Sequence, residues 1–271
     1  MPPYSREDLA KIWYWYLTGQ NKTRFSARYE AMSNVMRRTM ALFPGTPRCV
    51  ECNRPMLGLG GWLTHTHRSS YSPQLCDMCE TAMRSDEAGA EVPLSLLFAD
   101  VRGSTRLAET QSTTEFKQLI QRFYQAAGDV IIQHEGLVNR LMGDQVIGLF
   151  VPRFAGADHA KVAVAAALDL LRATGHGQPG GPWVPCGIGI HTGQAYVGAV
   201  GSKSGVNEIA VLGSAPNLAA RLSSQAADGE VLVSESAAAS ARLPGEGAEI
   251  RQLELKGLSQ PVAAWVLRVA Q

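Results

Sequence analysis

The sequence lacks the features that mark membrane-spanning, secreted and nucleic-acid-binding proteins. No run of about 18 or more apolar residues occurs, so no segment is predicted to cross a membrane. The opening residues MPPYSREDLA lack the basic-then-apolar order of a signal peptide. The net charge is only +1 and the basic residues are scattered, so nucleic acid is not expected as a partner. We therefore expect a soluble, cytoplasmic protein.

Internal repeats and low-complexity tracts are also absent, which excludes repeat and fibrous architectures. What is present is a hydrophobic content of 45%, enough for a substantial core. A length of 271 residues suits one full-sized domain and a smaller module. The five cysteines, in a chain without an export signal, are expected to be reduced or metal-bound instead of disulfide-bonded.

Four of these cysteines form two C-x2-C pairs, Cys49 with Cys52 and Cys76 with Cys79. Two such pairs supply four thiolates to a tetrahedral Zn²⁺, so the spacing predicts a structural zinc site. An iron-sulfur cluster is the alternative, because it also takes four thiolates. The two histidines between the pairs are expected to be loop residues. A closed four-thiolate site leaves no position for a substrate, which indicates a structural or regulatory module.

Two amphipathic helices are predicted before the cysteines, over Glu7–Leu17 and Phe25–Leu42, because apolar residues recur there at helical spacing. The cluster WYWY, Trp13 to Tyr16, lies in the first of them. We expect these aromatic rings to pack against a second helix or a dimer partner; a membrane-interface anchor is the alternative.

A buried strand that ends on a carboxylate is the first feature of the longer, C-terminal part of the chain. The apolar run Leu94–Ala99 has the length and residue types of a strand, and Asp100 follows it directly. A turn of small residues, RGST, comes next. Its free backbone N–H groups would suit phosphate.

A second carboxylate is predicted at the tip of a hairpin. Gly143 and Asp144 lie between the short apolar runs Leu137–Met142 and Val146–Val151, which is typical of a tight turn. If these strands are neighbours of the first, Asp100 and Asp144 converge at one edge of a sheet. Two carboxylates and a backbone carbonyl suit a pair of Mg²⁺ or Mn²⁺ ions that also hold a triphosphate.

The remaining pattern interleaves helices with a mostly antiparallel set of strands. Strands are expected near Val184–Ile190 and Ala195–Val200, and helices over Thr113–Glu135, Asp158–Ala173 and Ala215–Ala226. This order indicates an α+β fold of the ferredoxin-like kind, with helices covering one face of the sheet.

Four ordered motifs, FADVRGST, the GD hairpin, VLGSAPNLAARL and LELKG, together resemble the catalytic domain of class III nucleotidyl cyclases. The resemblance extends from Val92 to the C-terminus. It implies conversion of a nucleoside triphosphate to the 3′,5′-cyclic monophosphate and pyrophosphate, with two Mn²⁺ or Mg²⁺ ions per site. It implies that Asp100, Asp144 and the backbone carbonyl of Val101 hold these ions.

The resemblance also assigns residues to the transition state. Asn217 and Arg221 are four residues apart, so they share a face of a helix. They match the family's pair that orients the ribose and neutralises charge on the reacting phosphate. Lys256 matches a lysine used on the triphosphate. Pro216 replaces the usual apolar residue before the asparagine, a change that the first turn of a helix tolerates.

Base recognition departs from the pattern of the ATP-specific members. These resemble one another in a lysine and an aspartate or threonine at the positions of Arg140 and Ala210. Alanine accepts no hydrogen bond from the adenine amino group, and the arginine fork suits carbonyl oxygens. Similar altered determinants occur in bacterial pyrimidine cyclases that answer phage infection, so UTP and then CTP are the expected substrates. The alternatives are an adenylate cyclase with a relaxed base pocket and an inactive nucleotide-binding module.

The expected organisation is a helical segment over residues 1–46, the four-cysteine module over 47–82, a linker over 83–91 and the cyclase domain over 92–271. The resemblance implies a head-to-tail homodimer with composite sites. One protomer would supply Asp100 and Asp144, and its partner would supply Arg140, Asn217, Arg221 and Lys256. The cyclic nucleotide would act on an unidentified downstream receptor.

Overall fold

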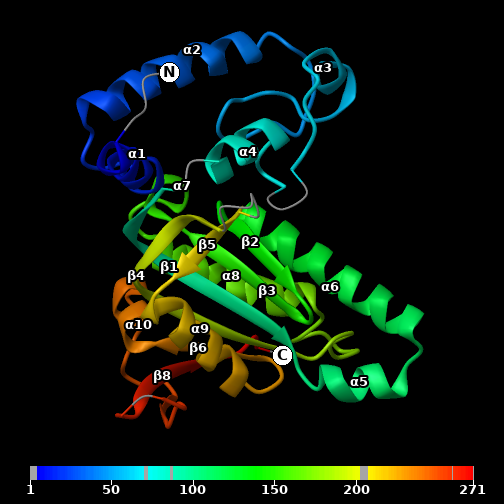
Figure 1. The fold of residues 1–271 in the computed structure, drawn as a ribbon. Coiled ribbons are helices and arrows are strands. Elements are labelled where there is room, and N and C mark those ends of the chain that lie inside the picture. Colours follow the sequence, from blue (N-terminus) through cyan, green and yellow to red (C-terminus); the bar gives the residue numbers. More distant parts are fainter. Residues whose placement is uncertain (1–4, 70–72, 86–87, 202–206, 258, 271) are drawn as a thin grey trace. The chain divides into compact units, whose positions relative to one another are not determined.

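The computed structural model describes residues 5–69, 73–85, 88–201, 207–257 and 259–270 (Figure 1). The chain divides into two compact units, one formed by residues 1–92 and 196–212 and the other by residues 93–195 and 213–271. Residues 86 and 87 of the predicted linker lie outside the described part. Within the described part, none of the helices has the length and apolar character needed to cross a membrane.

A mixed sheet of eight strands organises the chain, in the order β2-β3-β1-β4-β6-β8-β7, with β5 paired to β4. The pairs of β3 with β1 and β2 are antiparallel, whereas β4 and β6 are parallel. The strands are β1 Gly89–Val101, β2 Leu137–Met142, β3 Gln145–Phe150, β4 Cys186–Gly201, β5 Asn207–Leu212, β6 Glu230–Ser234, β7 Ile250–Leu253 and β8 Val262–Leu267. The α+β prediction is confirmed. The two strands expected between residues 184 and 200 are one continuous strand, β4.

Helices cover both faces of this sheet, so the expectation of helices on a single face is wrong. Val231 and Val233 of β6 belong to the main core, whereas Leu232 between them packs with Leu222 of α9 (Ser214–Gln225). Successive side chains of a strand point to opposite faces. Helix α9 therefore lies on the face opposite the helices of the main core, which are α6 Thr113–Gln133, α8 His159–Ala173 and α10 Glu235–Ala241 (Figure 1).

Shorter helices complete the second unit. They are α5 Ser104–Thr110 and α7 Pro152–Ala155. The first begins at the small residues that follow Asp100, after Gly103 adopts a left-handed conformation with φ 66°. Glycine adopts this conformation at little cost, which explains the abrupt change from strand to helix.

The described part of the first unit contains four helices, α1 Arg6–Thr18, α2 Arg24–Met40, α3 Gly58–Leu63 and α4 Asp77–Ser85. The aromatic cluster of α1 is largely buried, and the Trp15 ring meets the Tyr29 ring of α2 edge to face at 6.3 Å. Packing against a second helix is therefore confirmed, and the membrane-anchor alternative is wrong. The segment expected as a linker up to residue 91 already belongs to β1 from Gly89 onward, because that glycine packs closely against Gly198 of β4.

Candidate active site and metal centre

The register between β1 and β3 brings the two acidic residues together. Asp100 is the Cα partner of Gln145, the residue next to Asp144. The backbone N–H of Val101 donates to the carbonyl oxygen of Asp144 at 3.1 Å. Gly143 and Asp144 form the two-residue turn of the β2–β3 hairpin, with Gly143 at φ 63°. The predicted hairpin is present, and its strand β3 is a neighbour of β1, so the backbones of Asp100 and Asp144 lie close together.

Tyr124 of α6 contacts the turn of this hairpin. Its hydroxyl donates to the carbonyl oxygen of Gly143 at 2.7 Å. Burial raises the pKa of Tyr124, and the negative charge of Asp144 adds to the effect. The phenol therefore stays protonated and acts as a donor. Sequence reasoning missed Tyr124, since only the packing of α6 behind the hairpin reveals its position.

Arg102 is a second residue that the sequence did not single out. Its guanidinium forms an ion pair with Asp100 and donates to the carbonyl oxygens of Ser224 and Ala226 at 3.1 and 3.4 Å. Burial lowers the pKa of Arg102, and the charge of Asp144 opposes this shift. The side chain therefore places a positive charge beside the carboxylates and links the end of β1 to the C-terminal end of α9.

Helix α9 carries Asn217 and Arg221 on one face. Asn217 is exposed and Arg221 is half-buried. A Cβ atom added to Gly257 would lie 3.3 Å from a terminal nitrogen of Arg221, so the guanidinium lies beside the turn that holds Lys256. The structure thus brings Arg221 and the exposed Lys256 into one neighbourhood.

The candidate residues of the second unit consequently form two groups. Asp100 and Asp144 are adjacent through β1 and β3, and Arg221 and Lys256 are adjacent beside α9. Among the residues that the structure describes, no hydrogen bond or ion pair joins the carboxylates to Asn217, Arg221 or Lys256.

The two base-selecting candidates lie on strands. Arg140 is on β2, where a register shift separates it from Val138. Ala210 is on β5 opposite Gly198 and is 8% exposed. The two residues belong to different compact units.

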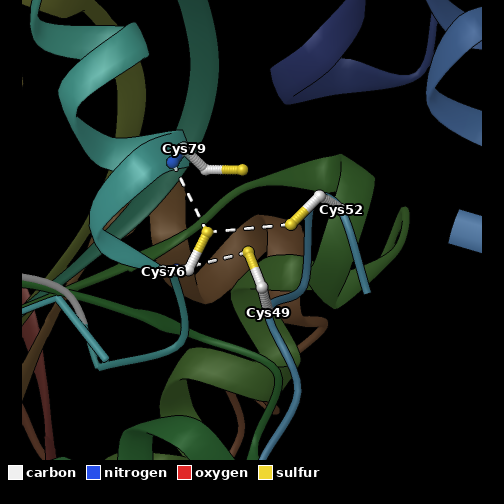
Figure 2. Close-up of side chains that lie close together, drawn as sticks. All are labelled: Cys49, Cys52, Cys76 and Cys79. Atoms are coloured by element: carbon white, nitrogen blue, oxygen red, sulfur yellow. Dashed lines mark hydrogen bonds between the residues drawn. The ribbon is translucent and has the colours of Figure 1, made fainter. Parts of the chain in front are cut away.

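The four paired cysteines come together in the first unit (Figure 2). Their sulfur atoms all lie within 4.8 Å of one another, and the Sγ atoms of Cys52 and Cys76 are 3.7 Å apart. Four thiolates at about 2.3 Å from a tetrahedral Zn²⁺ are about 3.8 Å from each other. The donor set and its spacing therefore fit zinc.

Backbone N–H groups surround these sulfurs, as in thiolate metal sites. The N–H of Cys76 donates to the sulfur of Cys49 at 3.3 Å, and that of Cys79 donates to the sulfur of Cys76 at 3.4 Å. Hydrogen bonds from Cys52 above all lower the pKa of the Cys49 thiol. The fifth cysteine, Cys186, is fully buried in β4, and burial raises the pKa of its thiol to about 12. It is a core residue with no metal-binding character.

Comparison with known proteins agrees with this fold. Residues 88–268 match the family model described as the adenylate and guanylate cyclase catalytic domain. The chain therefore belongs to the class III nucleotidyl cyclases, and residues 88–268 form their catalytic domain.

Similar proteins include cyclases for both purine nucleotides. The crystal structure of the guanylyl cyclase Cya2 has 29% identity and a TM-score of 0.56, over 66% of this chain and 92% of that one. The adenylyl cyclase CyaB from P. aeruginosa has 25% identity and a TM-score of 0.56, over 68% of this chain and 97% of that one. An adenylate cyclase of Anabaena cylindrica is 31% identical over 133 residues, 48% of this chain and 26% of that protein. The chain spans about a quarter to a third of the length of the curated relatives it matches.

Proposed function

We propose that this chain cyclises a nucleoside triphosphate, with Asp100, Asp144 and the carbonyl oxygen of Val101 as the metal-holding group. The single observation that supports it best is the β1–β3 register, which makes the two aspartates neighbours at the end of β1. Two divalent cations held there would activate the ribose 3′-hydroxyl and steady the pyrophosphate leaving group. Mn²⁺ and Mg²⁺ both accept such oxygen ligands.

Side chains of this protein would bind and orient the nucleotide and neutralise its charge. Asn217 would hold the ribose in the orientation for attack, and Arg221 would neutralise the charge that develops on the reacting phosphate. Lys256 would bind the triphosphate beside Arg221. Arg102 would hold Asp100 in place before the nucleotide enters.

For the base we propose UTP first and CTP second. Ala210 carries no acceptor for an exocyclic amino group, whereas the Arg140 guanidinium donates only. A pyrimidine with carbonyl oxygens at its edge suits a donor such as Arg140, and UTP presents more of these oxygens than CTP. A cyclic pyrimidine nucleotide would suit a role as an antiviral second messenger, acting on a downstream receptor.

The test is to incubate the purified chain with Mn²⁺ and each of ATP, GTP, CTP and UTP in turn, and to identify the products by mass spectrometry. Cyclic UMP is expected as the main product, with less cyclic CMP. An Ala210→Thr variant, which restores an acceptor, should shift the product ratio toward cyclic AMP. Cyclic AMP as the product of the unaltered chain would contradict the base assignment. If none of the four nucleotides gives a cyclic product, the chain would be an inactive nucleotide-binding module.

We also propose that the four cysteines hold one structural zinc ion. The 3.7 Å spacing of Cys52 and Cys76 supports this. Elemental analysis of the purified chain should find about one zinc per chain, reduced to near zero in a Cys49→Ser/Cys76→Ser variant. A Cys186→Ser variant is the control and should keep its zinc. A brown protein that contains iron would overturn the assignment.

A further inference from the structure

Arg102 contacts two parts of the candidate site at once. It directly follows β1, and its backbone N–H donates to the carbonyl oxygen of Pro185 at 2.9 Å. One terminal nitrogen of its side chain, Nη2, forms the ion pair with Asp100. The other, Nη1, donates to the carbonyl oxygens of Ser224 and Ala226 at 3.1 and 3.4 Å. The backbone of Arg102 is therefore fixed, and its guanidinium bridges an aspartate and the end of a helix.

The two carbonyl oxygens that accept from Arg102 lie at the C-terminal end of α9. Gln225 is the last residue of that helix, and Ala226 is its cap. The last carbonyl groups of a helix carry partial negative charge and find no partner within the helix, so a guanidinium is stabilised there. Because this contact uses a different nitrogen from the ion pair, it can persist when Arg102 loses Asp100.

The carboxylate of Asp100 is claimed by both Arg102 and the proposed metal ion. The side chains of Asp100 and Arg102 are each only 20% exposed, so water screens their charges less than it does at an open surface. A Mg²⁺ or Mn²⁺ ion on the same carboxylate would face the positive guanidinium, and the two cations repel each other. Metal binding at Asp100 therefore has to displace the guanidinium or overcome its repulsion.

We propose that Arg102 is a positioning residue with two separable effects on the cyclase reaction, an inference that rests on the proposed metal site at Asp100. Its charge holds Asp100 before the metal arrives and thereby lowers the affinity of the site for divalent cations. The planar fork of its two terminal nitrogens holds the end of α9, the helix that carries Asn217 and Arg221. A lysine would supply the charge but not the fork, because an ammonium group is a point charge.

The test uses two variants of the full, zinc-loaded chain, with Mn²⁺ affinity measured from the loss of the free-ion signal in electron paramagnetic resonance. Arg102→Gln removes the charge, so Mn²⁺ should bind at least about fivefold more tightly. Arg102→Lys keeps the charge, so the affinity should stay within about twofold of the unaltered chain. Both variants lack the fork, so kcat at saturating Mn²⁺ and nucleotide should fall roughly tenfold. A role in folding alone would not tighten metal binding.

Arg172→Gln is the matched control. Arg172 of α8 also pairs with an aspartate, Asp169, at 2.6 Å, but it is not among the candidate site residues, so Mn²⁺ affinity and kcat should not change. Unchanged or weaker Mn²⁺ binding by Arg102→Gln would overturn the effect of the charge, and a normal kcat in Arg102→Lys would overturn the effect of the fork. Equal Mn²⁺ binding by the unaltered chain and an Asp100→Ala variant would instead refute the metal site itself.

Discussion

Glu230 is an acid that the fold buries among arginines. Its side chain is 5% exposed, and Arg251 donates to its two carboxylate oxygens at 2.8 and 2.7 Å. Arg268 and the backbone N–H of Ala227 also donate to it. The hydrogen bonds from Arg251 above all lower the pKa of Glu230 from 4.5 to about 2. Strands β6 and β7 and the residue that follows β8 are thus joined at one carboxylate.

We expect a Glu230→Gln variant to lose roughly 2 kcal/mol of unfolding free energy at pH 7. The lowered pKa of Glu230 means that the folded state stabilises its charged carboxylate, and glutamine carries no charge. Because the folded pKa lies below the unfolded one, this stabilisation is present above pH 4.5 and disappears as the pH falls toward 2. Urea unfolding from pH 7 downward should therefore show the two proteins converging below pH 4.5.

The control for this series is Glu109→Gln, which changes an exposed acid of α5 and should stay within about 0.5 kcal/mol of the unaltered chain at every pH. A constant difference between Glu230→Gln and the unaltered chain across the pH range would show that packing, and not the charge of Glu230, supplies the stability.

At the scale of the element, the position of α9 depends on a glycine of β4. A Cβ atom added to Gly189 would lie 2.3 Å from the backbone nitrogen of Ser223 and 2.4 Å from the carbonyl oxygen of Ala219. Both atoms belong to the backbone of α9 and cannot move without the helix. The close contact therefore fixes the height of α9 above the sheet, and with it the positions of Asn217 and Arg221.

A Gly189→Ala variant should push α9 away from the sheet. We expect a loss of about 1–3 kcal/mol in unfolding free energy, which is usual for overpacking, and a fall in kcat as the Arg221 side chain shifts. The matched control is Gly128→Ala on α6, where an added Cβ meets nothing within 4 Å. That change should stabilise the chain by about 0.5–1 kcal/mol, because alanine is the better helix former. Normal activity in Gly189→Ala would show that the height of α9 is not critical.

At the scale of the whole molecule, the head-to-tail homodimer that the family resemblance implies leads to a test of shared sites. Asp144→Ala and Arg221→Ala chains should each be inactive alone. In an equal mixture, half of the dimers would be mixed, and each would hold one intact site. We therefore expect about a quarter of the normal activity after subunit exchange.

A mixture of Asp100→Ala with Asp144→Ala is the matched control for shared sites. Both changes fall on the same side of each site, so no mixed dimer would hold an intact one and no activity should return. Recovery in this control, or none in the Asp144→Ala and Arg221→Ala mixture, would contradict the composite arrangement.

Local chemistry explains how much of this protein could be predicted. The strand before Asp100, the Gly143-Asp144 turn, the four thiolates and the Asn217–Arg221 face depend on residues close together in the chain, whose types and spacing dictate turns, helices and metal ligands. The family and the candidate residues therefore followed from the sequence.

Contacts between distant segments were decided by the tertiary structure alone. The links of Tyr124 to Gly143 and of Arg102 to Ser224, and the side of the sheet on which α9 packs, join segments whose proximity no local pattern encodes. The same holds for α3, where close packing admits only glycine on the inner face and leaves Trp62 outside. The steric limit at Gly60 arises from the backbone of Pro44, a segment that no local pattern brings against the helix.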